Sequence, residues 1–144
     1  MWPLVEQTEI GLRRLVRVGF DSRWKQQAND HIRRAIGEVA WATVVGNHDK
    51  YAKSYPRSHQ TVEVDEVLNF TYLGQLVQMV VWKGSWDLFK HLFRDKRELE
   101  DMIRDIVPVR NDSSHFRSVP EHELNRCRVR CVDLLTILER NQQI

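Results

Sequence analysis

The sequence predicts an all-α protein that folds as an antiparallel bundle of four or five helices. Apolar residues recur every three or four positions along most of its 144 residues, which is the period of an amphipathic helix. Glycine, proline and short polar runs separate these segments, as turns between helices require. The strand-like alternation over residues 62–64 is too short to predict a sheet. The length indicates a single domain over residues 1–144.

The first two helices are predicted over residues 4–20 and 23–45. In both segments the apolar residues gather on one side and leave charged residues for the other. Asp21 and Ser22 separate the two helices, because both residue types favour helix N-caps. Gly46 is expected to end the second helix.

The middle of the chain is predicted as a loop followed by a central helix. Residues 47–61 are polar, contain a proline and show no sustained period, which predicts a loop or insertion. Residues 64–82 are rich in apolar side chains and predict a helix at the centre of the bundle. Gly84 interrupts that pattern, and Ser85 is expected to cap a short helix that follows.

The last two helices are marked by their predicted N-termini. Asp95 and Glu98 have the spacing of a capping box, which predicts a helix that runs to about residue 107. Pro108 is expected to kink or end it. Ser118 and Glu121 form a second capping box at the start of the terminal helix.

Composition excludes several classes of protein. Hydrophobic residues make up 42% and charged residues 29%, so the chain is neither disordered nor membrane-spanning. The N-terminus lacks a basic stretch followed by an apolar one, which argues against secretion and favours the cytoplasm. A net charge of +2 excludes a polycationic nucleic-acid clamp but leaves room for local arginine patches. Cys127 and Cys131, four positions apart, are expected to be free thiols in the core.

The segment that precedes the terminal helix carries the candidate chemistry. It contains Arg110, Asn111 and, after three further residues, His115. An arginine guanidinium can fork onto phosphate oxygens, and an imidazole can take or give a proton near neutral pH. Both residue types can act on a phosphodiester, so Arg110 and His115 are the candidate catalytic residues and Asn111 a candidate supporting residue.

This segment resembles the signature of the HEPN superfamily. That signature is an arginine, four to six residues of which the first is polar, and a histidine, placed before the last helix. The resemblance covers the C-terminal half, whereas the N-terminal half matches only as amphipathic helices. It implies a HEPN-like bundle and an endoribonuclease in which the ribose 2′-hydroxyl attacks the adjacent phosphorus and leaves a cyclic phosphate. It also implies that no metal or other cofactor is needed.

The resemblance further implies partners. Related domains act as toxins or defence effectors, so RNA is the expected substrate, and an antitoxin or a larger sensor protein is a possible partner.

Residues five apart on a helix point about 140° apart. Arg110 and His115 therefore share one site only if the chain leaves the helix near Asp112, or if a second copy completes the site. Members of the family commonly pair, and we expect a homodimer.

Other interpretations of the same residues remain open. Arg110 can instead pair with an acid on a neighbouring helix. Arg117 and His122 repeat the spacing of the motif but straddle a proline, and we treat them as a decoy. The early glutamates Glu6 and Glu9 are expected on a solvated face.

Metal binding and two other functions are alternatives to the nuclease. Four residues have the side-chain types of zinc ligands: Cys127, Cys131, His115 and His122. The spacing of the two cysteines fits a buried helix face better than a zinc site. Two rival functions stay open beside the nuclease. One is a catalytically silent HEPN-like module that binds RNA or a nucleotide, or that holds a complex together. The other is an unrelated helical interaction domain.

Overall fold

The computed structural model describes residues 2–55, 66–114 and 117–142. Every regular element in these ranges is helical, which confirms the all-α prediction. The α-helices are α1 (Trp2–Trp24), α2 (Ala28–Ile36), α3 (Glu38–Ser54), α5 (Leu73–Val81), α6 (Trp86–Phe89), α7 (Lys96–Ser114) and α8 (Glu121–Gln142). Short 3₁₀ helices are η1 (Lys25–Gln27), η3 (Val67–Phe70) and η4 (Lys90–Leu92). None of the described helices combines the length and the apolar character that crossing a membrane requires.

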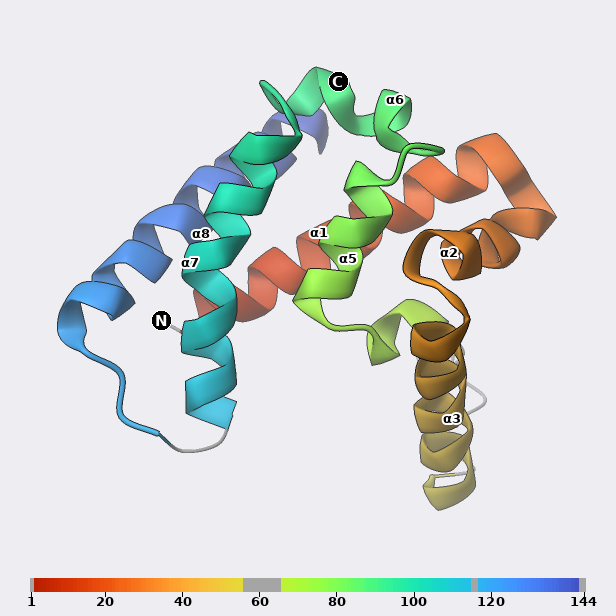
Figure 1. The fold of residues 1–144 in the computed structure, drawn as a ribbon, viewed down its shortest axis with the longest axis horizontal. Coiled ribbons are helices and arrows are strands. Elements are labelled where there is room, and N and C mark those ends of the chain that lie inside the picture. Colours follow the sequence, from red (N-terminus) through yellow and green to blue (C-terminus); the bar gives the residue numbers. More distant parts are fainter. Residues whose placement is uncertain (1, 56–65, 115–116, 143–144) are drawn as a thin grey trace.

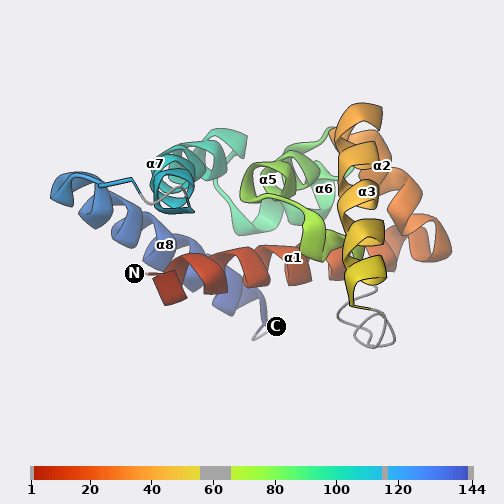
Figure 2. The ribbon, with the colours of Figure 1, turned by 90° about the horizontal axis from the view of Figure 1, so that it is seen from below.

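The long helix α1 organises the molecule. It runs along one side, while α5, α6 and α7 lie on the other side of the core (Figure 2). Helices α7 and α8 lie side by side, and α8 also packs against α1 (Figure 1). Helix α5 contacts both α1 and α7. Helix α3 contacts α2 and η3 and projects from the rest (Figure 1).

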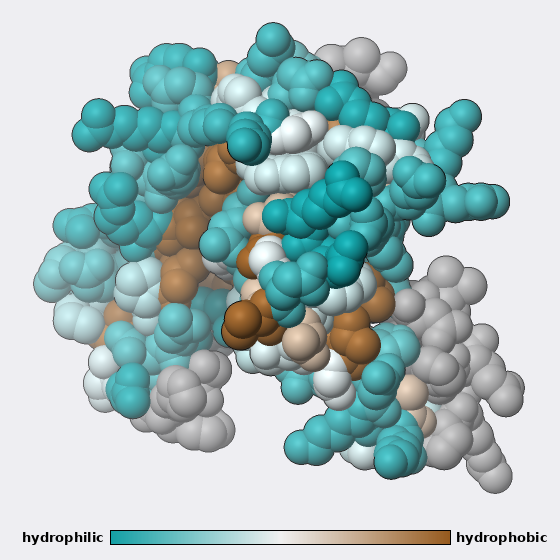
Figure 3. All heavy atoms as spheres, turned by 45° about the vertical axis from the view of Figure 1, so that its right-hand side comes forward, coloured by the Kyte–Doolittle hydropathy of each residue, from teal (hydrophilic) through white to brown (hydrophobic). Residues whose placement is uncertain are grey.

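The core follows the predicted helix period. Leu12, Val16 and Phe20, spaced four residues apart on α1, are fully buried. Cys127 and Cys131 on α8 are free and fully buried, which confirms them as core thiols. A hydrogen bond with Cys131, together with burial, raises the pKa of the Cys127 thiol. The face drawn in Figure 3 is mainly hydrophilic, and hydrophobic residues show in a recess on it.

The N-terminal helices differ from the prediction at their ends. Helix α1 continues past Asp21 to Trp24, because Asp21 pairs with Arg17 one turn earlier and Trp24 packs on Phe20. The helix predicted over 23–45 is divided at Gly37, whose φ of +93° is incompatible with a helix.

The predicted loop is partly helical. Helix α3 passes through Gly46 and ends at Ser54, so residues 47–54 are not a loop as predicted. Glycine lowers helix propensity, but it does not by itself end a helix. Residues 56–61 of the predicted loop lie outside the described residues.

The central helix is shorter than predicted. It begins at Leu73, not near residue 64, because Thr71 and Tyr72 are extended. The Thr71 hydroxyl donates to the Leu68 carbonyl, and the Tyr72 amide donates to the Gln75 side chain. These two hydrogen bonds replace the helical ladder at this point.

Helix α7 begins as predicted and ends later. The Glu98 amide donates to Asp95 Oδ1 at 2.8 Å, which confirms the Asp95 cap. Pro108 does not end the helix, which continues to Ser114. Ile106 and Val109, on either side of the proline, are buried, and their burial offsets the lost hydrogen bond.

The two remaining helix starts differ from the prediction in position or in contacts. Helix α8 begins at Glu121, two residues later than an N-cap at Ser118 predicts, and the Pro120 carbonyl accepts from the amides of Glu123 and Leu124. A short helix follows Ser85, but the Ser85 hydroxyl donates to the Met79 carbonyl and does not cap it.

An ion pair fixes the segment before α5 onto α1. Arg17 Nε donates to Glu66 Oε2 at 2.7 Å, and Arg17 Nη2 donates to Glu66 Oε1 at 2.5 Å. Burial raises the pKa of the Glu66 carboxyl, whereas hydrogen bonds from Arg17 and the Leu68 amide lower it. The hydrogen bonds have the larger combined effect, so the pKa lies below its ordinary value. The stability that this carboxylate contributes is therefore complete above its ordinary pKa and is lost as the pH falls through its lowered value.

The Glu66→Gln substitution tests this contribution. We expect it to lower the free energy of unfolding by about 1 kcal/mol at neutral pH, since the pair is partly exposed. The difference from the wild type should shrink as the pH falls below the ordinary carboxyl pKa and vanish below the lowered pKa of Glu66. Denaturant unfolding at several pH values measures it, with Glu38→Gln, which alters an exposed ion pair, as the control. A difference that stays constant with pH would contradict the assignment.

Candidate functional site

Arg110 lies near the C-terminal end of α7 and reaches across to α1. Its Nε donates to Glu9 Oε1 at 2.5 Å. The Glu9 side chain is only 10% exposed, and that of Arg110 is 29% exposed. Arg110 thus has the acidic partner on a neighbouring helix that the sequence left open. Among the described residues, its Nη1 and Nη2 have no hydrogen-bond partner, so the outer edge of the guanidinium is available to a ligand.

Glu9 also holds a second arginine. Arg13 Nη2 lies 3.2 Å from Glu9 Oε2 and 3.3 Å from the Thr71 carbonyl oxygen. The pKa of the Arg13 guanidinium lies below its ordinary value. Burial and the nearby charge of Arg110 lower it, and the carboxylate of Glu9 raises it. One carboxylate therefore balances two facing guanidinium groups, and the cluster keeps one excess positive charge.

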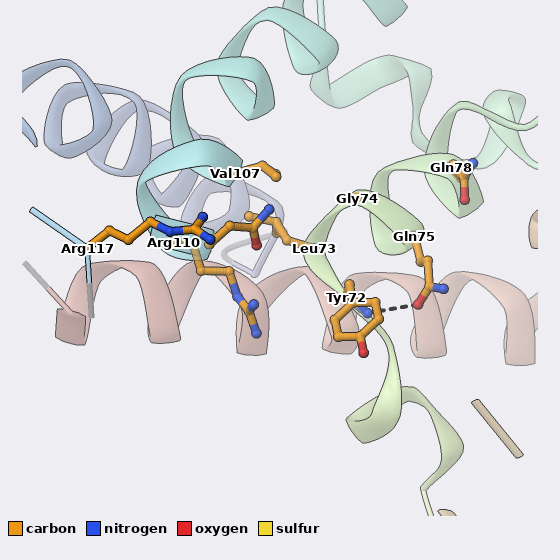
Figure 4. A pocket seen from close by; sticks show the side chains of 9 residues that line it. Tyr72, Leu73, Gly74, Gln75, Gln78, Val107, Arg110 and Arg117 are labelled. Carbon is orange, nitrogen blue, oxygen red and sulfur yellow. Dashed lines mark hydrogen bonds between the residues drawn. The ribbon is translucent and has the colours of Figure 1, made fainter. Parts of the chain in front are cut away.

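An open pocket of about 840 Å³ lies beside this cluster, between α5 and α7. Arg110 and Arg117 lie on the α7 side, while Tyr72, Gln75 and Gln78 come from α5 and the residue before it (Figure 4). The described lining residues include no carboxylate. The pocket is therefore cationic on one side and aromatic and amide-lined on the other. The complete lining is Tyr72, Leu73, Gly74, Gln75, Gln78, Val107, Arg110, Asn111 and Arg117.

Two of the three predicted site residues line this pocket. Arg110 and Asn111 belong to its wall. His115 lies outside the described residues. Helix α7 stays regular to Ser114, so the departure from helix predicted near Asp112 does not occur there. The geometry that joins Arg110 to His115 stays a prediction.

The sequence prediction is wrong about Glu9 and does not anticipate Arg117 in the pocket. Glu9 was placed on a solvated face, but it is buried, because its position follows the stripe of Val5, Leu12 and Val16 on α1. That stripe is visible in the sequence and gives a signal for the burial. Arg117, taken as part of a decoy, lines the pocket. No sequence pattern links α5 to the motif, so Tyr72, Gln75 and Gln78 were not anticipated.

A site made by Arg117 and His122 and a zinc site both find little support in the described residues. His122 is exposed and contacts Glu123, with 3.3 Å between Nε2 and Oε1, and does not line the pocket. Cys127 and Cys131 are enclosed in the core. Within the described ranges, no group of three or more His, Cys, Asp and Glu side chains has the arrangement of a metal site.

No protein-family model, curated protein or solved structure matches the chain. The resemblance to the HEPN superfamily therefore depends on the residues of the motif and on their position before the last helix.

Proposed function

We propose that the chain is a metal-independent endoribonuclease with a HEPN-like helical bundle, acting as a toxin or defence effector. The observation that carries the proposal is the state of Arg110. Arg110 Nε donates to Glu9, and the two Nη groups of Arg110 have no hydrogen-bond partner in the described part of the chain. Arg110 also lines an open pocket beside Arg117. A guanidinium fixed through Nε and free at its outer edge suits bidentate contact with a phosphate.

The reaction assigns one task to each residue. His115 takes the proton of the ribose 2′-hydroxyl, and the 2′-oxygen attacks the adjacent phosphorus. Arg110 binds the non-bridging oxygens and stabilises the charge that develops on them. The bond from phosphorus to the 5′-oxygen breaks, and that oxygen leaves as a hydroxyl after it receives a proton. The products are a 2′,3′-cyclic phosphate and a 5′-hydroxyl, and Asn111 orients the groups around the phosphate.

A second histidine supplies the acid in this scheme. One imidazole acts as base while another, already protonated, donates to the leaving oxygen. A homodimer that joins two motifs provides both histidines. The Arg110–Glu9 ion pair supports one rival, a catalytically silent module that binds RNA or a nucleotide, since an arginine held this way also has a structural role.

Cleavage of total RNA in the presence of EDTA separates these functions. We expect the wild type to cut RNA and His115→Ala to lose cutting while it still binds. Binding by the wild type without cleavage would favour the silent module, and the absence of both would exclude the two proposals together.

Mixing two inactive variants tests the composite site. Chains carrying Arg110→Ala are combined with chains carrying His115→Ala under conditions that allow subunit exchange. If each site takes Arg110 from one copy and His115 from the other, mixed dimers hold one such pair but only one His115, so they recover the part of the activity that does not need the second histidine. Activity in a wild type that sediments as a monomer would contradict the homodimer.

A further inference from the structure

Tyr72 presents an unused aromatic face at the mouth of the pocket. Its side chain is half-exposed at 53%, and no described ring stacks on it. Its backbone amide donates to Gln75 Oε1 at 2.9 Å, which fixes Tyr72 at the start of α5 (Figure 4). The exposed ring is available to stack on a planar ligand.

Two amides lie beside this ring on α5. Gln75 uses its oxygen to hold Tyr72 and keeps its Nε2 group available. Gln78, one helical turn further, is exposed, and neither end of its amide has a partner among the described residues. Gly74 directly precedes Gln75, and a Cβ at its position would meet no atom within 4 Å, so the space beside it is open. Amide groups donate and accept hydrogen bonds at the same time, as the edges of nucleobases do.

The opposite wall supplies the complementary charge. Arg110 and Arg117 line the same pocket. A nucleotide complements these two walls. Its anionic phosphate matches the arginines, and its flat, neutral base, rich in hydrogen-bond donors and acceptors, matches the aromatic ring and the amides. The pocket volume of about 840 Å³ lies within the range that encloses small organic ligands.

We infer that Tyr72, Gln75 and Gln78 form a nucleobase subsite for the nucleotide whose phosphate contacts Arg110. The base stacks on Tyr72, and the two amides contact its edge. This inference rests on the proposed function, since the bound nucleotide is part of single-stranded RNA. Base stacking on a protein aromatic requires an unpaired base, so the subsite selects single strands over duplexes.

The test measures binding separately from cleavage. The probes are two short fluorescent oligodeoxynucleotides of equal length, one with bases and one abasic, and neither has the 2′-hydroxyl that cleavage needs. The variants are Tyr72→Ala, Tyr72→Phe and Gln78→Ala, with Tyr55→Ala as the control because Tyr55 is equally exposed at 56% but lies outside the pocket. Fluorescence anisotropy gives each Kd, and thermal unfolding checks that each variant folds.

The inference predicts a base-dependent loss. Tyr72→Ala should weaken binding of the base-bearing strand about tenfold and leave the abasic strand unchanged. Gln78→Ala should weaken the same strand less, and Tyr72→Phe and Tyr55→Ala should match the wild type. Equal losses for both strands, or no loss for either, would overturn the subsite, as would a wild type that does not prefer bases.

The result is distinguishable from failure of the nuclease proposal. If the wild type cleaves RNA and Tyr72→Ala binds the base-bearing strand normally, the nuclease proposal stands and the nucleobase subsite is contradicted. A wild type that never cleaves RNA but loses base-dependent binding on Tyr72→Ala keeps the subsite and removes the nuclease.

Discussion

Arg110→Ala is expected to lower the rate of RNA cleavage by about 10³-fold. In the proposed transition state the Nη groups of Arg110 bind the charged phosphate oxygens, and alanine has no group that can bind them. The folded state should survive, because the side chain is partly exposed and Glu9 keeps Arg13 as a partner. Single-turnover cleavage of a defined RNA measures the loss.

Two further variants sharpen this prediction. Arg110→Lys retains the charge but loses the fork and the Nε donor, so most of the activity should still be lost. Arg104→Ala removes another arginine from α7 that is 73% exposed and lies outside the pocket, and it should cleave at the wild-type rate. Equal rates for Arg110→Ala and Arg104→Ala would show that Arg110 has no catalytic role.

Glu9→Gln is expected to produce the second largest effect. The substitution keeps the size of the side chain but removes the charge that two guanidinium groups share. Arg13 and Arg110 would then face each other without a counter-charge, and we expect a loss of about 2 kcal/mol in the free energy of unfolding. Cleavage should fall about 10- to 100-fold, because Arg110 loses the contact that orients it.

The control for this variant lies one turn earlier on the same helix. Glu6 is exposed, and Glu6→Gln should change neither stability nor cleavage. A double-mutant cycle separates positioning from general destabilisation. In the Arg110→Lys background, Glu9→Gln should lower cleavage much less than in the wild type, because the orientation of the Arg110 fork is already lost. Equal losses in both backgrounds would assign Glu9 a structural role only.

The sequence predicts the helical class because the apolar period of α1, α7 and α8 is strong. The stripe of Leu12, Val16 and Phe20 and the Asp95 cap appear as expected. Helix ends were predicted less well. Gly37, which divides the second predicted helix, has no sequence feature that distinguishes it from Gly46, which lies inside α3. The difference depends on how α2 and α3 pack, and a local pattern does not contain that information.

The candidate site was predicted only on the segment that carries the motif. Arg110 and Asn111 are adjacent in the sequence and line one pocket. Glu9 is about a hundred positions away and meets Arg110 only because α1 and α7 both pack against α5 and α8. Tyr72 enters the pocket because α5 begins at Leu73, nine residues later than the apolar pattern predicts. Contacts between distant helices are a property of the packed structure, and periodicity along one helix does not reveal them.

The most direct test of the proposed nuclease is a single change in the RNA. Once a cleavage site is mapped in the presence of EDTA, the same RNA is prepared with one 2′-deoxyribose on the 5′ side of the scissile phosphate. The wild type should cut the normal RNA to a 2′,3′-cyclic phosphate and a 5′-hydroxyl and should leave the substituted position uncut. Cleavage of the substituted RNA at that position, or products that carry a 5′-phosphate, would contradict attack by the 2′-hydroxyl.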